Sequence, residues 1–156
     1  MPHLIIHYTG QLDQEVDMPA VCRAMAQTLR GVRDEHHEPV FPTGGIRVLA
    51  YPAPHYALAD GGEAGLAASG RSDYAFMYLN LRMGKGRSEL TQQRAGEAIS
   101  QTIQTLMADL GRSKARAIID ELADDELHAL MTNLGGHDIE TMIDENWLRI
   151  CHKDDE

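Results

Sequence analysis

The sequence predicts a layered α+β fold, in which a duplicated β-α-β unit forms a four-stranded sheet with two main helices on one face, plus an extra C-terminal helix. Short apolar segments with two-residue alternation are separated by longer segments with 3.6-residue periodicity. The order strand, helix, strand occurs twice, and a crossover helix makes the strands that it joins parallel. The length of 156 residues, 43% of them hydrophobic, fits one domain over residues 1–156, with a core at 1–110 and a divergent extension at 111–156.

The first unit is expected over residues 3–51. Residues 3–8 (HLIIHY) predict a largely buried strand, because apolar residues occupy both of its faces. Asp17 can cap a helix that runs to about Arg30 and presents an apolar face every four residues. That face consists of Val21, Met25 and Leu29. A turn at 42–45 leads into a second strand at 46–51, and the glycine- and alanine-rich residues 60–72 are expected to form an exposed loop.

The second unit begins with an apolar strand expected at 73–83. It continues through Gly84-Lys85-Gly86-Arg87-Ser88 into a long helix at about 89–110. Residues 114–132 are expected to be helical again, and residues 138–143 to form a last short strand. Because both main helices cover one face of the sheet, the other face is left open. That face is apolar, so we expect other subunits to bury it.

The charge distribution separates the chain into two parts. A net charge of −10 argues against general nucleic-acid binding, which needs a basic surface. Residues 1–112 hold 12 acids and 10 bases, a net of −2, whereas residues 113–156 hold 12 acids and 4 bases, a net of −8. The first part can therefore still form a cationic pocket, while the second predicts an acidic, solvated surface.

Two further features of the sequence predict a cytoplasmic location. No apolar stretch approaches the ~20 residues that span a membrane, and the N-terminus lacks the pattern of a secretory signal. The cysteines Cys22 and Cys151 have no CxxC spacing, which is typical of a protein in a reducing compartment.

Pro2 is the first candidate catalytic residue. Methionine before a small residue is normally removed, which would make Pro2 a secondary amine at the chain terminus. A terminal amine titrates near ~8 in model peptides, and burial beside cations lowers its pKa further. Such a group is a general base near neutral pH. The alternative is that Pro2 only begins a strand, a position where proline is tolerated.

Two arginines beside glycines are the other candidates. Arg87 lies between a predicted strand and a helix N-terminus, where backbone amides attract anions and a guanidinium can bind a carboxylate. Arg47 follows Gly45 and Ile46 at the start of the second strand. A plain strand-to-helix turn and a solvated strand edge are the respective alternatives. The pair His36-His37 lies among acids, but without the spacing of a metal site it predicts a solvated loop.

Several of these stretches together resemble the 5-carboxymethyl-2-hydroxymuconate isomerases of the tautomerase superfamily. The resemblance covers residues 1–107 apart from inserts, and its distinctive part is the run from 73 to 97. The stretches that carry it are MPH at 1–3, FP at 41–42, GIR at 45–47, ADG at 59–61, DYAF at 73–76, GKGRS at 84–88 and QQRAGE at 92–97.

The resemblance implies a homotrimer of β-α-β repeats with its active site near Pro2 at a subunit boundary. It implies Pro2 as catalytic base, with Arg47 and Arg87 binding substrate carboxylates and polarising the dienol. The implied reaction is a proton shift in a small anionic unsaturated 2-hydroxy acid, of the kind met in aromatic-compound breakdown. It implies no metal and no organic cofactor, and the net charge and the short apolar stretches predict neither nucleic acid nor a membrane as partner.

The sequence departs from the family pattern in three places. Residues 31–40 and 62–72 look like loop insertions near the expected pocket, and residues 111–136 replace a short link. These departures leave the substrate open between 5-carboxymethyl-2-hydroxymuconate and the substrate of a related phenylpyruvate-type tautomerase or haloacrylate dehalogenase. A non-catalytic oligomeric binding protein is the alternative from another class. The choice between trimer and hexamer, and the removal of Met1, stay open at this point.

Overall fold

The computed structural model describes residues 1–69 and 75–121. The chain divides into two compact units, Met1–Ala59 with Ala75–Leu106 and Asp60–Tyr74 with Met107–Glu156, and each is described by itself. The elements in chain order are β1 (His3–Thr9), α1 (Leu12–Glu15), α2 (Met18–Gly31), the short 3-10 turn η1 (Thr43–Gly45), β2 (Arg47–Ala53), α3 (Glu63–Ser69), β3 (Met77–Arg82) and α4 (Glu89–Glu121).

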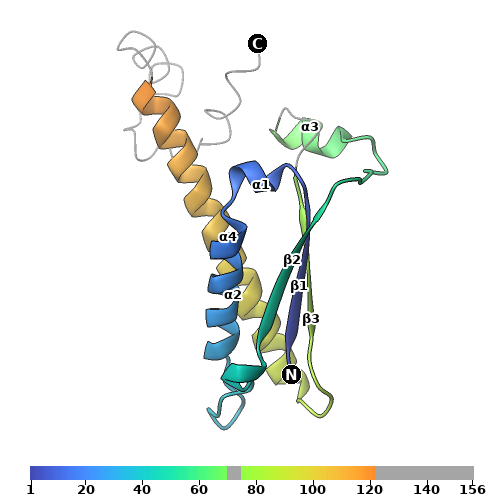
Figure 1. Ribbon diagram of the computed structural model, residues 1–156, viewed down its shortest axis with the longest axis vertical. Coiled ribbons are helices and arrows are strands. Elements are labelled where there is room, and N and C mark those ends of the chain that lie inside the picture. Colours follow the sequence, from blue (N-terminus) through green and yellow to red (C-terminus); the bar gives the residue numbers. More distant parts are fainter. Residues whose placement is uncertain (70–74, 122–156) are drawn as a thin grey trace. The chain divides into compact units, whose positions relative to one another are not determined.

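The first unit is organised around a mixed three-stranded sheet with β1 in the centre (Figure 1). β1 pairs parallel with β2 and antiparallel with β3, in the order β2-β1-β3. The parallel pair joined by α2 agrees with the predicted first β-α-β unit. The four-stranded sheet and the duplicated unit are not confirmed, because the expected strand at 138–143 and the end of the expected second C-terminal helix lie outside the described residues.

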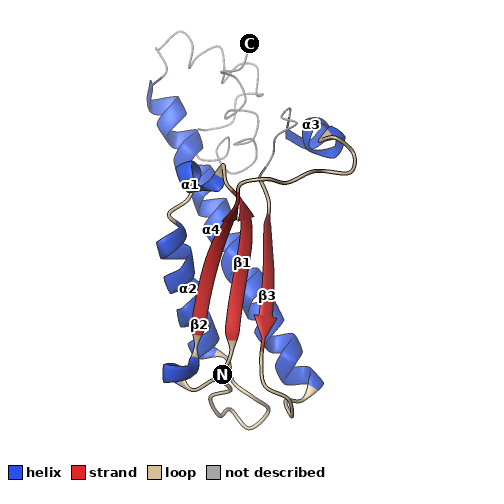
Figure 2. Ribbon diagram, turned by 45° about the vertical axis from the view of Figure 1, so that its right-hand side comes forward, coloured by secondary structure: helices blue, strands red, loops and turns tan. Residues whose placement is uncertain are grey.

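One face of the sheet packs against both α2 and the first part of α4 (Figure 2). Leu4 and Ile6 of β1 and Met25 of α2 are fully buried, and Ile99 of α4 is buried in the same core cluster. The two helices also meet directly, since the hydroxyls of Thr28 and Thr102 lie 2.8 Å apart. The prediction of two helices on one face is therefore confirmed for this unit.

The opposite face of the sheet is open in the single chain. Three rows of paired residues cross it: Arg47, His3 and Arg82 at one end, Leu49, Ile5 and Asn80 in the middle, and Tyr51, His7 and Tyr78 beyond them. Leu49, Tyr51 and Tyr78 are 41%, 47% and 58% exposed. The face thus changes from cationic to apolar and aromatic along the strands.

Local signals explain the well-predicted helix α2. The Asp17 side chain accepts a hydrogen bond from the Ala20 backbone amide at 2.9 Å, which satisfies one unpaired donor of the first turn. Val21, Met25 and Leu29 are buried at the spacing that the sequence indicates. The proline at the start of the helix lies where its missing N–H removes no hydrogen bond.

Two expectations were wrong, and one element was not predicted. Within 60–72, residues Glu63–Ser69 form α3 instead of loop, because the Asp60 carboxylate accepts bonds from the Gly62 and Ala64 amides at 2.9 and 2.8 Å and caps the helix. The break expected after residue 110 is absent, since α4 runs unbroken to Glu121 with one glycine there and no proline to end it. The short helix α1 was not predicted at all.

The strand expected at 73–83 is shorter in the structure, where β3 spans Met77–Arg82 and residues 70–74 lie outside the described part. None of the helices within residues 1–69 and 75–121 is both long and apolar enough to cross a membrane.

Candidate active site

Pro2 lies buried at the beginning of the central strand. Its side chain is less than 2% exposed, whereas Met1 in front of it is 69% exposed. The Pro2 carbonyl accepts a hydrogen bond from the Arg47 backbone amide at 3.1 Å. While Met1 is attached, the Pro2 nitrogen is an amide without a hydrogen and has no basic lone pair. The structure therefore places Pro2 beside Arg47, and its role as a base stays a prediction.

Arg47 begins β2 and is exposed. Its Nη1 donates to the carbonyls of Gly44 and Ile46 at 2.8 and 3.0 Å, so the guanidinium folds back over turn η1. Its register partner is His3, the residue after Pro2. The parallel pairing of β1 and β2 thus brings the second predicted site residue to the first.

Turn η1 packs closely against the start of the chain. A Cβ atom added at Gly45 would lie 3.1 Å from Pro42 Cγ and 3.3 Å from Met1 Cγ. Both distances are tighter than ordinary van der Waals contacts, so a side chain there would push on the turn and on the residue before Pro2. A glycine at this position is therefore explained by the close approach of two segments.

Arg87 lies in the connection between β3 and α4 and is half-buried. Its Nη1 donates to the Gly84 carbonyl at 3.0 Å, and its Nη2 donates to the Val40 carbonyl at 3.2 Å. Its Cζ lies 5.2 Å from the centre of the buried Phe41 ring, within the range of a cation–π contact. These contacts hold the guanidinium over the segment that leads into turn η1.

The three predicted residues gather at one end of the sheet. The chain start, turn η1 and the β3–α4 connection all lie at this end (Figure 1). The backbones of Pro2 and Arg47 are joined by a hydrogen bond. The Arg87 side chain is hydrogen-bonded to Val40, which lies just before turn η1, and that turn packs against Met1. The structure thus brings the segments that carry the three residues to one end of the sheet.

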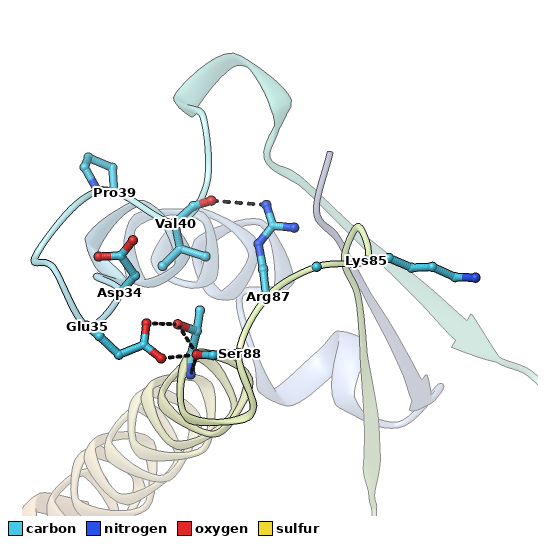
Figure 3. A pocket seen from close by; sticks show the side chains of 9 residues that line it. Asp34, Glu35, Pro39, Val40, Lys85, Arg87 and Ser88 are labelled. Carbon is cyan, nitrogen blue, oxygen red and sulfur yellow. Dashed lines mark hydrogen bonds between the residues drawn. The ribbon is translucent and has the colours of Figure 1, made fainter.

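A cavity of about 460 Å³ opens beside Arg87, between the loop at 34–40 and the first turn of α4. Figure 3 shows the Asp34 and Glu35 carboxylates on the loop, Arg87 reaching the Val40 carbonyl, and Lys85 extending away from them. The cavity wall therefore carries both acidic and basic side chains, whereas a site built only to bind a carboxylate would carry basic ones alone.

Glu35 is the residue of this cavity that sequence reasoning missed. Its carboxylate accepts hydrogen bonds from the hydroxyl of Ser88 and, at 3.1 Å, from the hydroxyl of Thr91 (Figure 3). The Ser88 hydroxyl is the leading reason why the pKa of Glu35 lies below its ordinary value. The available signal was the run of acids in the insertion, but no pattern along the chain indicates a partner for them.

The histidine pair of the same insertion lies on a tight turn. The Asp34 carboxylate accepts from the backbone amides of His36 and Glu38 at 2.8 and 3.0 Å, and His37 has a φ of 62°. Among residues 1–69 and 75–121, no three side chains of the metal-binding types cluster as a metal site would require.

Comparison with known proteins identifies relatives over most of the chain. The family model for 5-carboxymethyl-2-hydroxymuconate isomerase matches residues 2–128. A 5-carboxymethyl-2-hydroxymuconate Delta-isomerase of Escherichia coli is 30% identical over 128 residues, which are 82% of this chain and 88% of that protein.

Two solved structures are also similar. A crystal structure of a 5-carboxymethyl-2-hydroxymuconate delta-isomerase is 61% identical with a TM-score of 0.65, covering 70% of this chain and 73% of its own. A 5-carboxymethyl-2-hydroxymuconate isomerase from Deinococcus radiodurans R1 is 33% identical with a TM-score of 0.54, covering 69% and 70%.

Proposed function

Because the chain belongs to the 5-carboxymethyl-2-hydroxymuconate isomerase family, we propose that it converts an unsaturated 2-hydroxy acid, such as 5-carboxymethyl-2-hydroxymuconate, into its conjugated 2-oxo isomer. Membership of this family makes the chain an isomerase, and the substrate is the proposed part. The observation that carries the proposal is the burial of Pro2 beside Arg47 at the start of the central strand. The family match begins at this same residue.

Pro2 acts as the base once Met1 has been removed. Burial and nearby cations disfavour the protonated amine, which lowers its pKa toward neutrality. The amine accepts the proton of the substrate's 2-hydroxyl group, and the electron pair left behind spreads through the diene as a dienolate. The protonated amine then returns the proton to a carbon of the diene. One proton leaves oxygen and one reaches carbon, so the enzyme is regenerated.

Arg47 and Arg87 supply the positive charge that this intermediate needs. A guanidinium can hold a carboxylate through two parallel hydrogen bonds. Cations fixed before the reaction stabilise charge that develops on the dienolate without having to reorganise. Both steps need only proton transfer and electrostatic stabilisation, so the proposal assigns no role to a metal or an organic cofactor.

The proposed assembly is a homotrimer that buries the open face of the sheet. Its exposed Leu49, Tyr51 and Tyr78 support this part of the proposal, because contiguous exposed apolar side chains commonly mark subunit contacts. We further propose a cytoplasmic role in aromatic-compound breakdown, which the free thiol of Cys22 supports.

Two measurements test the proposal together. Intact mass spectrometry of the purified chain should show the loss of one methionine residue. A panel of 2-hydroxymuconates, phenylenolpyruvate and haloacrylates should show turnover of the 2-hydroxymuconate in preference to the others. Preference for phenylenolpyruvate or a haloacrylate would replace the substrate but keep the base. Retention of Met1 in an active preparation would remove Pro2 from the mechanism, and no turnover across the panel would favour a binding protein.

A further inference from the structure

Glu35 connects the inserted loop to the residue that follows Arg87. Its two carboxylate oxygens accept from the hydroxyls of Ser88 and Thr91. The Ser88 oxygen in turn accepts from the Thr91 backbone amide at 3.1 Å, as a capping residue of α4 does. The Ser88 hydroxyl also lies 3.1 Å from the Thr91 hydroxyl oxygen, so its single proton is shared between Thr91 and the Glu35 carboxylate, whereas the Thr91 proton is directed to the carboxylate. The contact joins segments that are 53 and 56 residues apart.

Holding Glu35 in place also restricts the position of Val40, because backbone hydrogen bonds join the two arms of the loop. The Asp34 amide donates to the Glu38 carbonyl at 3.0 Å, and the Val40 amide donates to the Val32 carbonyl at 3.2 Å. Arg33 and Pro39 form a bridge between the two arms. Arg94 of α4 adds a second tie, since its Nη1 donates to the Asp34 carbonyl at 2.9 Å. Fixing Glu35 therefore also restricts Val40.

Arg87 contacts the same loop whose other arm is held by Glu35. Its guanidinium donates to the Val40 carbonyl and lies over the Phe41 ring, both at the end of the loop, while Ser88 next to it holds Glu35 at the other arm. The pKa of Glu35 is lowered mainly by the Ser88 hydroxyl, so its carboxylate is charged at neutral pH. Loop, helix start and arginine thus brace one another.

We infer that Glu35 is a positioning residue, which holds the 34–40 loop on the first turn of α4 and thereby orders the Arg87 guanidinium for a substrate carboxylate. This inference rests on the proposed function, in which Arg87 binds the acid. A disordered guanidinium must be ordered again each time substrate binds, and that cost appears in the affinity. Because Glu35 does not touch the reacting atoms, the chemical step is spared.

The kinetic experiment compares Glu35→Ala and Glu35→Gln with the wild type. A misplaced binding group can cost up to about 100-fold, and for this exposed brace we expect Glu35→Ala to raise KM by about threefold to tenfold, with kcat within about twofold. Glu35→Gln keeps one acceptor and can donate to Thr91, so its KM should stay within about twofold of wild type. Glu38→Ala removes an exposed carboxylate from the same loop and serves as the matched control, with KM unchanged.

A double-mutant cycle separates positioning from a direct effect. In an Arg87→Ala background the anchored group is gone, so Glu35→Ala should change KM by less than about twofold. An equal rise in KM with and without Arg87 would show that Glu35 acts on the substrate or the cavity wall, and would overturn the inference. An unchanged KM in the single Glu35→Ala variant would also overturn it.

A spectroscopic readout keeps this inference separate from the proposed function. The side-chain Nε–Hε signal of Arg87, assigned by its loss in Arg87→Ala, should be sharp in the wild type and in Glu35→Gln and broadened in Glu35→Ala. An unaltered signal in Glu35→Ala would refute the positioning role. If the wild type turned over none of the acids in the panel, the proposed function would fail. The Arg87 signal would still show whether Glu35 orders the guanidinium.

Discussion

Phe41→Leu isolates the contribution of an aromatic ring to the placement of Arg87. Phe41 is 2% exposed, and the Arg87 Cζ lies 5.2 Å from its ring centre. Leucine keeps an apolar side chain in the core but removes the π-face. The change should therefore act on two separable quantities, the stability of the fold and the affinity for an anionic substrate.

The two magnitudes follow from the packing. Replacing a fully buried phenylalanine by the smaller leucine leaves part of its volume empty, which should lower the free energy of unfolding by about 1–2 kcal/mol. A partly exposed cation–π contact contributes about 0.5–1 kcal/mol, and its loss corresponds to a rise in KM of about two- to fivefold. The value of kcat should stay unchanged, because the proposed mechanism gives the ring no part in proton transfer.

Phe76→Leu provides the matched control. Phe76 is 39% exposed, and its ring meets Tyr56 edge-on with centres 5.6 Å apart. Within residues 1–69 and 75–121 no arginine lies over this ring, so the same chemical change should leave KM unchanged. The assay is steady-state turnover with chemical denaturation of both variants. A Phe41→Leu protein that is less stable but has a wild-type KM would refute the cation–π argument. The placement of Arg87 would then depend on its hydrogen bonds to the Gly84 and Val40 carbonyls.

Four further outcomes are expected. Pro2→Ala should lower kcat by at least about 10-fold with the unfolding transition unchanged, because a primary amine differs from proline in basicity and geometry; wild-type turnover would exclude Pro2 as the base. Met25→Ala should lower the free energy of unfolding by about 2–5 kcal/mol, because its side chain is fully buried; a smaller loss in denaturant titration would show that the core collapses around it. The hydrogen bond to Asp13 raises the pKa of Tyr8 to about 12, so the contribution of Tyr8 to stability should be fully present below pH 10 and be lost between about pH 10 and 12. Tyr8→Phe should lack that component of the fall, and identical alkaline unfolding of both proteins would contradict it. The pKa of Glu35 is lowered from 4.5, so any stability that wild type has over Glu35→Gln should be present above that pH and vanish as the pH falls through the lower pKa; a constant difference in acid would speak against the Ser88 bond.

Elements with strong local patterns were predictable from the sequence. Residues 3–8 and the helix after Asp17 carry periodicity and a cap, and the structure forms both within one residue of the expected ends. Helix α3 was missed because its glycine- and alanine-rich composition suggested a loop. A usable signal was nevertheless present, since an aspartate just before a helix commonly accepts from an amide of the first turn, as Asp60 does from Ala64.

Of the candidate site, only the parallel pairing of the strands that begin near Pro2 and Arg47 could be predicted from the sequence. Parallel pairing follows from the crossover helix, but the register that joins Arg47 to Pro2 is a property of the folded sheet. The contact between Glu35 and Ser88 lies 53 residues apart along the chain, and it depends on how the Asp34 turn closes. Such a contact has no sequence period, so residue patterns do not reveal it.

The hydrogen bond from the Arg47 amide to the Pro2 carbonyl has a practical consequence for handling the protein. Both of its atoms lie on the retained side of the bond that an aminopeptidase would cut. Removal of Met1 therefore leaves this hydrogen bond intact. A preparation that retains Met1 should have a melting temperature and a light-scattering mass close to those of a trimmed one. Under the proposed mechanism, batches that look equally well folded can differ entirely in their content of free Pro2 amine, so specific activity should be normalised to the trimmed fraction.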